Sequence, residues 1–508
     1  MVGALVLCAV LGCGRHAPPP PRFLQVDIEN SPTSTDPRFA TDAISSRINE
    51  LVFDSLVRVD RHGRFVGQLA ESIERPGETH IVFHLKRGIR FSDGREMTAR
   101  DVKYTYDTTI NPSSMSPKRG GFAELKSIEA PDDRTIVMTT YRPYAPAMEM
   151  AMLEIVEEGT PLPRKSAAPA PAGTGPFRMV RYARDDSIWL ERNAYRQFAP
   201  DAPMGIVFKI VPDPTVRALE LAEGICDLAE NNIEPEVLPY LISVPALEVN
   251  ESAGTTYQYL GLNFRNPLLR DVRIRRAIAY AIDRKAIAAS YLRGTARVAS
   301  GMLAPENWAY DGKVAIYDYD PERARRLLEE AGFHADAGGR RDIRFVYKTT
   351  PEGGRLAETI QAMLRRVGIE VEIRSNEWAT FYGDIQKGNF DLMSSRWIGI
   401  NDPNHYYLVF DSSMTPPRGL NRGAYSNREM DSLLEQGATT IDPEQRRRIY
   451  ARVQEIAAED LPYISLWWIQ NVVVMNRAVR NFTPYPNGSL RSLAEVKLAD
   501  DRAEGASR

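Results

Sequence analysis

The chain has 508 residues, of which 43% are hydrophobic and 26% are charged. This is an ordinary globular composition, and the length is sufficient for two or three domains that each bury a core. The net charge is −3, and the basic residues are scattered along the chain rather than gathered in a stripe. We therefore expect no nucleic-acid partner.

The chain begins with an apolar segment, MVGALVLCAVLGC at 1–13, which is followed by a basic and Pro-rich stretch. A membrane span needs about 20 helical residues, so this segment is too short to cross a bilayer and is typical of an export signal. VLGC at 10–13 resembles the lipobox of bacterial lipoproteins. The resemblance implies that Cys13 is lipidated and that 14–22 form a tether. The alternative is a disordered apolar N-terminus with an incidental cysteine.

The first half of the chain is rich in strand patterns. Apolar and polar residues alternate in THIVFHLK at 79–86 and RTIVMTTY at 134–141, which predicts two half-buried strands. FSDG at 91–94 predicts a turn that leads into a helix from about Ala99. The Pro-, Ala- and Gly-rich stretch at 160–176 predicts the edge of a subdomain.

The second half alternates between helices and strands. DVRIRRAIAYAI at 271–282 carries one apolar stripe, and DPERARRLLEEAG at 320–332 has a capping aspartate and a terminal glycine, so both predict helices. Strand patterns at 343–347, 369–374 and 390–394 then alternate with helix patterns at 355–367 and 378–386. Short strand–helix–strand connections of this kind predict a parallel α/β sheet.

The motifs that would indicate catalysis or metal binding are incomplete, wrongly spaced or absent in this sequence. GTGPF at 173–177 lacks the further glycine and the lysine of a phosphate loop. His80 and His84 lie on a predicted strand, where their spacing puts them about 13 Å apart, too far to share a metal ion. The sequence contains no G-x-S-x-G, HExxH or P-loop motif. We therefore expect no enzyme activity, cofactor or metal.

Five stretches, in one order, resemble the bacterial solute-binding proteins of the peptide and nickel class that serve ABC importers. They are FSDGREMTARDVKYTYD at 91–107, GTGPF at 173–177, LGLNFRNPLLRDVRIRRAIAYAIDR at 260–284, YDPERARRLLEEAGF at 319–333 and LPYISLW at 461–467. The resemblance implies an α/β, two-lobed, periplasmic-binding-protein-like (type II) fold with an extra subdomain inserted in the first lobe.

Mapped onto this chain, the resemblance gives the domain boundaries. Lobe I is expected to comprise 23–50, 171–262 and 473–500, with the inserted subdomain at 51–170 and lobe II at 263–472. Two crossing strands join the lobes, and we expect the crossings near Asn263, taken as the hinge residue, and near Val473. Ligand-driven closure of the lobes is then a hinge motion.

The same resemblance implies the residues of the ligand cleft. EWATF gives Trp378, and the next strand ends in Trp397; the segment after the first Asp-Pro pair of the mature chain gives Thr41 and Asp42. Aromatic walls suit a receptor that accepts varied side chains. The alternative for each tryptophan is a packed core aromatic.

RWIGINDPNHYY at 396–407 departs from the family pattern. Peptide receptors carry an aspartate three residues after this tryptophan, which pairs with the α-ammonium of the ligand, whereas this chain has Ile400. Asp402 either takes over the amine-binding role or forms a turn. His405 either binds a metal chelate, as in the nickel branch, or is an exposed loop histidine.

The leading hypothesis is a lipid-anchored monomeric receptor that delivers a peptide or another small oligomeric solute to the permease of an ABC importer. The membrane is contacted only through the lipid. One alternative is a receptor of the same fold for a non-peptide solute, such as an oligosaccharide, an opine or a nickel chelate. The other is a hydrolase that acts in the same cleft.

Overall fold

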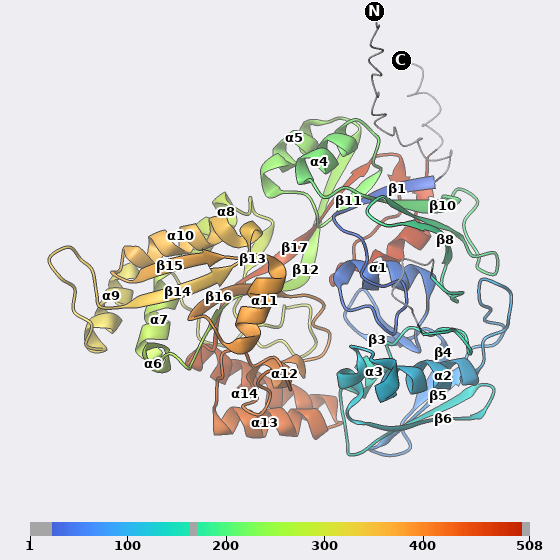
Figure 1. Ribbon diagram of the computed structural model, residues 1–508, viewed down its shortest axis with the longest axis horizontal. Helices are drawn as coiled ribbons and strands as arrows, with labels where there is room; N and C mark the ends of the chain where they lie inside the picture. The colour runs from blue at the N-terminus through green and yellow to red at the C-terminus, as the bar shows by residue number, and fades with distance from the viewer. Residues whose placement is uncertain (1–22, 163–169, 500–508) are drawn as a thin grey trace, which may run out of the picture.

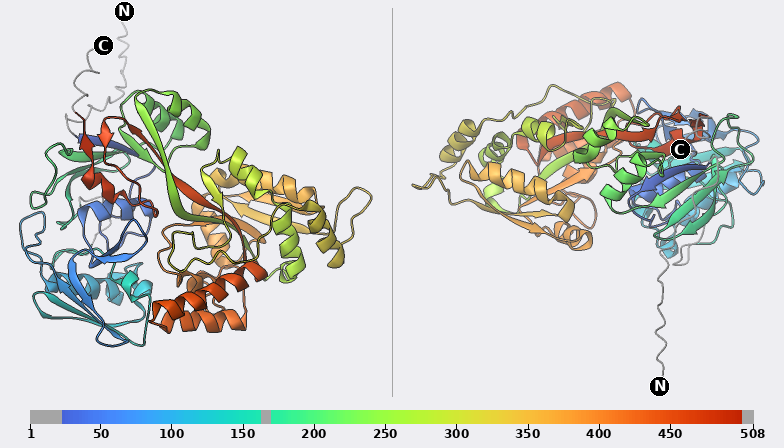
Figure 2. Two further views of the ribbon diagram at one scale, coloured as in Figure 1. Left: turned by 180° about the vertical axis from the view of Figure 1, so that it is seen from behind. Right: turned by 90° about the horizontal axis from the view of Figure 1, so that it is seen from above.

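The computed structural model describes residues 23–162 and 170–499, so the expectations for Cys13 and the tether lie outside the described residues. The molecule has two halves that are joined by two long antiparallel strands, β12 (Leu247–Leu262) and β17 (Tyr463–Asn476). In Figures 1 and 2 these strands run from one half into the other. The two-lobed α/β fold is therefore as the sequence predicts.

The pairing of β12 with β17 is interrupted at the point where the chain passes between the lobes. The register shifts between Ser252 and Thr256. Within this break, a Cβ atom on Gly254 would lie 2.1 Å from the carbonyl oxygen of Ile469, so the close approach of the two strands requires a glycine. The crossing therefore lies at 253–255.

Asn263, the expected hinge residue, lies outside this break in the strand pairing. It follows the end of β12 and is held inside lobe II, where its side-chain amide donates to the carbonyl oxygens of Gly388 and Phe390 at 2.9 and 2.6 Å. These bonds fix Asn263 to one lobe. Val473, the other expected crossing, pairs with Asn250 on the lobe I side of the break.

Lobe I is built on a mixed sheet. Its strands are β1 (Phe23–Ile28), β8 (Phe177–Ala183), β9 (Ser187–Arg192), β10 (Gly205–Ile210) and β11 (Leu228–Glu230), and its helices are α1 (Ala43–Val52), α4 (Pro214–Ala222) and α5 (Leu238–Ser243). A short ribbon of β18 (Val479–Arg480) and β19 (Lys497–Leu498) completes the lobe. The apolar faces of β1, β10 and α1 share one core.

The inserted subdomain has its own core. Its sheet has the order β4 (Ala70–Glu74), β5 (His80–Leu85), β7 (Thr135–Thr140), β6 (Leu125–Asp132), covered by α2 (Ala99–Ile110) and flanked by α3 (Ala147–Met150) and the pair β2 (Val57–Val59) and β3 (Phe65–Gly67). The subdomain core runs from Leu56 to Ile155, whereas residues 51–53 pack in lobe I. The buried residues of the subdomain core thus lie within the expected insertion at 51–170.

Lobe II contains the parallel strands β14 (Arg344–Thr349), β15 (Glu370–Ser375) and β16 (Leu392–Trp397), with β16 joined to β12. Strand β13 (Ala296–Val298) pairs with β17. The helices are α6 (Pro267–Arg270), α7 (Val272–Ala281), α8 (Arg284–Ser290), α9 (Pro321–Glu330), α10 (Gly354–Arg365), α11 (Trp378–Lys387), α12 (His405–Phe410), α13 (Arg428–Thr439) and α14 (Pro443–Asp460).

Strand alternation gives lobe II two cores, one on each face of its sheet. In β12, Leu260 and Leu262 pack with α7, α9 and α10, whereas Tyr257 and Tyr259 point to the opposite face and pack with α11 to α14. A single eleven-stranded sheet, in the order β15-β14-β16-β12-β17-β11-β1-β10-β9-β8 with β13 alongside β17, continues through both lobes. The second face, with α11 and α12, carries the aromatic residues expected at the cleft.

Candidate functional site

Trp397 is the last residue of β16 and pairs in register with Tyr257 of β12. Its half-buried indole stacks on the ring of Tyr259, with the centroids 6.0 Å apart, and meets the ring of His405 edge-on at 4.7 Å. Tyr259 in turn stacks on Tyr463 at 3.9 Å. One side of lobe II therefore presents a connected group of aromatic rings where β16 ends.

Trp378 extends this group toward solvent. It is the first residue of α11, its side chain is 59% exposed, and its ring stacks on that of Tyr382, one helical turn further on, at 5.7 Å. We refer to Trp378, Tyr382, Trp397 and His405 as the aromatic wall. In Figure 1, the helices α11 and α12 that carry part of it lie on the side of lobe II that faces lobe I and the inserted subdomain.

Arg422 lies between two rings of the aromatic wall, a position that no sequence pattern predicts. Its guanidinium lies 5.1 Å from the ring centroid of Trp397 and 5.4 Å from that of Tyr382. The residue is only 5% exposed. Among residues 23–162 and 170–499, no carboxylate forms an ion pair with it, and its Nε has no hydrogen-bond partner. Arg422 is thus a buried cation that lies against aromatic faces and beside the hydroxyl of Tyr259.

His405 contributes a neutral ring to the wall. Burial, together with the nearby charge of Arg422, lowers the pKa of His405 to about 4. Its Nε2 atom is buried without a hydrogen-bond partner in the described part of the chain, and so is Nε1 of Trp397. Buried polar atoms are nearly always satisfied, so two unsatisfied nitrogens beside an uncompensated arginine indicate a place for a polar group from outside the chain.

Asp402 has a different environment from the one expected of an amine-binding residue. Its carboxylate forms a bidentate ion pair with Arg446 of α14, at 2.5 and 2.7 Å, and accepts a hydrogen bond from the backbone N–H of Asn404 at 2.8 Å. Both members of the pair are buried. The carboxylate is therefore engaged inside lobe II, and its bond to Asn404 is that of a turn-forming aspartate.

Ile400 and its neighbour Asn401 line a cavity where the lobes meet. The cavity has a volume of about 30 Å³ and is lined by Val59, Asp60, Gly63, Thr255, Glu306, Asn307, Ile400, Asn401, Pro486 and Asn487. These residues come from lobe I, the inserted subdomain, β12 and lobe II. The segment that follows β16 therefore lies at the junction of the lobes, and the cavity there has room for only about one or two waters.

Thr41 and Asp42 lie on lobe I at the start of α1. Asp42 caps the helix by accepting from the backbone N–H of Ser45 at 2.8 Å, and it also accepts from the hydroxyl of Thr33. Although burial favours the neutral acid, the hydrogen bonds from Ser45 and Thr33 lower the pKa of Asp42. Thr41 is exposed. The structure thus brings Trp378, Trp397 and His405 together, while Asp42 serves the helix terminus.

The lobes touch each other on both sides of the junction. Arg142 of the inserted subdomain pairs with Glu435 of α13, and the backbone N–H of Ala145 donates to the carbonyl oxygen of Ala438 at 2.8 Å. Elsewhere, Arg355 of α10 pairs with Glu236 of lobe I at 2.9 Å. In Figure 1, α3 of the inserted subdomain lies beside α12 and α13. These contacts describe a closed arrangement of the lobes.

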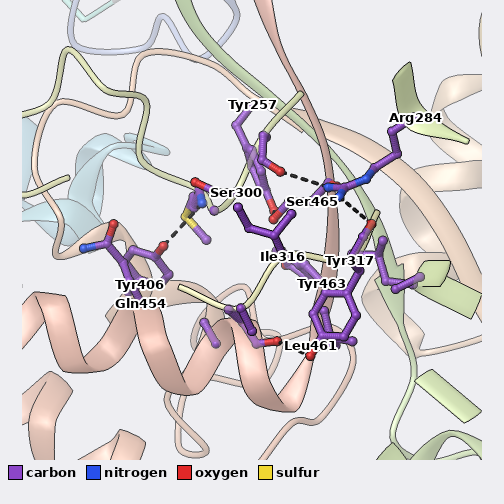
Figure 3. Close-up of a pocket in the computed structure, with 18 of the residues that line it drawn as sticks. Tyr257, Arg284, Ser300, Ile316, Tyr317, Tyr406, Gln454, Leu461, Tyr463 and Ser465 are labelled. Atoms are coloured by element: carbon purple, nitrogen blue, oxygen red, sulfur yellow. Dashed lines mark hydrogen bonds between the residues drawn. The ribbon is translucent and has the colours of Figure 1, made fainter. Parts of the chain in front are cut away.

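A second cavity, also of about 30 Å³, lies inside lobe II (Figure 3). Arg284 on its lining donates to the carbonyl oxygens of Ala299, Tyr317 and Ser465 at 2.8–3.0 Å, and Tyr257 shares a hydrogen bond of 2.8 Å with the hydroxyl of Ser465. The hydrogen bonds of Arg284, Tyr257 and Ser465 are thus made within the protein, whereas the hydroxyl of Tyr463, also on the lining, has no partner among the described residues.

Metal-binding clusters and membrane-spanning helices are both absent from the described residues. No group of three or more His, Cys, Asp or Glu side chains is arranged to hold a metal ion within 23–162 and 170–499. No helix in the same residues combines the length and apolarity that a membrane span requires. Cys226 is a free, buried thiol.

Comparison with known proteins places this geometry in a family. The sequence pattern of "Bacterial extracellular solute-binding proteins, family 5 Middle" matches residues 64–416. The oligopeptide-binding protein AppA of Bacillus subtilis is 27% identical over 92% of this chain and 90% of its own length. The dipeptide-binding protein of Escherichia coli is 27% identical over 77% of this chain and 78% of its own.

Two solved structures of similar proteins have the same fold as this chain. AppA of Bacillus subtilis, in complex with a nonapeptide, superposes with a TM-score of 0.80 at 25% identity, covering 94% of this chain and 98% of that one. NikZ of Campylobacter jejuni, in complex with Ni(L-His), has the same fold, with a TM-score of 0.82 at 24% identity over 94% and 100% of the two chains. The chain therefore belongs to family 5 of the bacterial extracellular solute-binding proteins.

Proposed function

We propose that the protein is an extracytoplasmic receptor that captures a peptide-like solute between its two lobes and delivers it to an ABC importer. The observation that carries this proposal is the aromatic wall, which has unsatisfied polar atoms and whose helices α11 and α12 lie on the side of lobe II that faces lobe I (Figure 1). Aromatic rings supply a large contact area at a small entropic cost, which suits a ligand of varied side chains. The peptide ligands in the names of AppA and the dipeptide-binding protein support the same class.

In this proposal the protein binds and releases its solute without making or breaking a bond. The contacts between Arg142 and Glu435 and between Arg355 and Glu236 hold the closed state, and the solute adds to them through its differential affinity for that state. Closure then gives the permease a surface to recognise. We further propose that the receptor acts as a monomer and is tethered through lipid on Cys13.

A non-peptide solute is the second candidate, because two features of lobe II do not suit a peptide ammonium. Ile400 is buried in an apolar core where peptide receptors keep an acid, and Asp402 is paired with Arg446. A solute without a free amine would need neither an acid at position 400 nor an unpaired carboxylate on Asp402. The complex of NikZ with Ni(L-His) shows that this fold also holds a chelate.

Incubation of the purified protein with a peptide mixture, followed by recovery and mass spectrometry, tests the proposal. We expect intact peptides to be enriched in the protein-bound fraction. Cleaved peptides would instead support the hydrolase alternative, and enrichment of sugars or metal chelates from a parallel culture extract would overturn the peptide class.

Membrane fractionation of Cys13→Ser tests the tether. The variant should move from the membrane to the soluble fraction, with Cys226→Ser as the control that stays in the membrane fraction. A Cys13→Ser protein that remains with the membrane would contradict lipidation at this residue.

A further inference from the structure

We propose that Arg422 selects for a negatively charged group on the solute. It binds a carboxylate of the solute against the aromatic wall. This inference rests on the proposed function, since it assumes that a solute is held between the lobes. It goes further by assigning the solute a free carboxylate at lobe II, where the peptide receptors of the resemblance hold an ammonium.

The first step is the energetic state of Arg422 in the closed protein. Its side chain is buried, and no carboxylate in the described residues pairs with it. Burial of a charge without a counter-ion is costly, and contacts with the faces of Trp397 and Tyr382 offset only part of that cost. An anion that enters between the lobes would therefore pair with the buried charge of Arg422 and offset the free-energy cost of burying it.

The second step is that Arg422 is held in place. Its backbone N–H donates to the carbonyl oxygen of Leu420 at 2.8 Å, and its own carbonyl oxygen accepts from Arg265 at 2.8 Å. The neighbouring Asn421 is fixed by bonds to the carbonyl oxygens of Asp411 and Tyr425 at 3.0 and 2.8 Å. A guanidinium that is oriented before the ligand arrives loses little entropy on binding.

The third step is the set of groups around the guanidinium. Nε of Arg422, Nε1 of Trp397 and Nε2 of His405 are buried nitrogens without partners in the described chain. The indole Nε1 is only a donor, and the neutral imidazole can donate from Nε2. These groups match a planar acceptor such as a carboxylate, which an arginine can bind through two parallel hydrogen bonds.

The same environment disfavours an ammonium. Burial and, to a smaller extent, the charge of Arg422 lower the pKa of His405, and the same charge would repel a second cation beside the wall. Asp402 is neutralised by Arg446, and Ile400 is apolar. The solute should therefore present to lobe II a C-terminal or side-chain carboxylate, and its amine, if it has one, should lie elsewhere.

The experiment compares four pools that are incubated with the full protein and recovered by mass spectrometry. The first is a pool of peptides of three to nine residues that lack Asp and Glu; the second and third are the same pool after N-acetylation and after C-amidation. The fourth contains non-peptide carboxylates and phosphomonoesters. The variants are Arg422→Met and Arg422→Lys, with Arg418→Met as the control, because Arg418 is an exposed residue of the same loop.

We expect the free and N-acetylated peptides to be retained equally, and the amidated peptides to be retained about 10- to 100-fold less, as the loss of a hydrogen bond between charged groups implies. Arg422→Met should abolish this discrimination, Arg422→Lys should keep part of it, and Arg418→Met should leave it unchanged. Peptide binding should also raise the pKa of His405, followed by NMR, since the carboxylate offsets the charge of Arg422.

The other outcomes separate this inference from the proposed function. Equal retention of free and amidated peptides, or loss on N-acetylation, would overturn the role of Arg422 while a peptide receptor stands. Retention of non-peptide carboxylates alone would support Arg422 and overturn the peptide class. A preference for phosphomonoesters would contradict the carboxylate assignment, and retention of none of the pools would contradict both proposals.

Discussion

Arg446 and Arg422 are two buried arginines of lobe II with opposite surroundings. Arg446 is bound on two sides: Asp402 accepts from both terminal nitrogens, and the carbonyl oxygen of Gly437 accepts from Nε at 2.8 Å. Arg422 lies against the rings of Trp397 and Tyr382, and no carboxylate among the described residues neutralises it. Both residues are about equally buried, at 5% exposure.

The difference shows how to tell structural charges from binding charges in a closed cleft. A buried charge with a full set of partners contributes to the fold, and its removal leaves the partner uncompensated. A buried charge without a counter-ion contributes little to the stability of the fold, but a ligand of opposite charge can pair with it. Asp402, which the sequence offered as a ligand group, belongs to the first class, and Arg422 belongs to the second.

The largest expected effect is the loss of stability when Arg446, the paired arginine, is replaced. Arg446→Met should lower the free energy of unfolding by about 3–5 kcal/mol, because it leaves the buried carboxylate of Asp402 without its counter-ion. Denaturant-induced unfolding of the unliganded protein measures this loss. The double variant Asp402→Leu/Arg446→Met is the matched control and should recover most of it. A loss below about 1 kcal/mol for the single variant would contradict a structural role for the pair.

The buried carboxyl groups of Asp27 and Glu230 provide a third case, in which burial favours the neutral acid. Burial, with help from the charge of Glu220, raises the pKa of Asp27 to about 7, and burial raises that of Glu230 to about 8. Folding then binds protons, so this contribution to stability is full below about pH 4 and is lost as the pH rises through 7 to 8. Unfolding at pH 5 to 9 should show the decline, and Asp27→Asn should make it shallower. A wild-type stability that rises over this range would contradict the assignment.

Arg422→Met should change the stability of the unliganded protein by less than about 1 kcal/mol, or increase it, since it removes an uncompensated buried charge and adds an apolar side chain. The measurement is the same unfolding experiment that is used for Arg446→Met. A destabilisation as large as that of Arg446→Met would indicate that Arg422 is structural, and the contrast between the two arginines would disappear.

The smallest expected effect concerns closure. Arg142→Ala removes an ion pair with Glu435 that spans the lobes, and a partly exposed pair of this kind contributes about 0.2–1 kcal/mol. Because the pair joins the inserted subdomain to lobe II, affinity for the captured solute should fall by about fivefold at most, with little change in unfolding. Arg344→Ala breaks an exposed pair with Glu372 inside lobe II and is the control. An equal loss of affinity in both variants would argue against a role in closure.

Much of the fold could be predicted because its signals are local. The alternation in 79–86 became β5, and the capped helix at 320–332 became α9, with Asp320 accepting from the backbone N–H of Arg323 at 2.8 Å. Periodicity and caps require only neighbouring residues. The parallel order of β14, β15 and β16 likewise followed from short strand–helix–strand connections.

The site was harder to predict from the sequence than the fold, because its main contacts join distant parts of the chain. Trp397 and His405 came from a resemblance, but the partner of Asp402 lies 44 residues away on α14. Arg422 lies in a loop before α13, in a sequence with no motif, and only the tertiary fold places it over Trp397. Tyr259 could have been found, since Tyr257 and Tyr259 share one face of a strand.

A crystal structure of the protein loaded with the peptide that it captures tests the central claim most directly. The account predicts a carboxylate oxygen of the peptide within about 2.7–3.2 Å of the Arg422 guanidinium, against the rings of Trp397 and Tyr382, with Asp402 still paired to Arg446. A peptide ammonium bound to Asp402, with Arg446 displaced, would contradict the account.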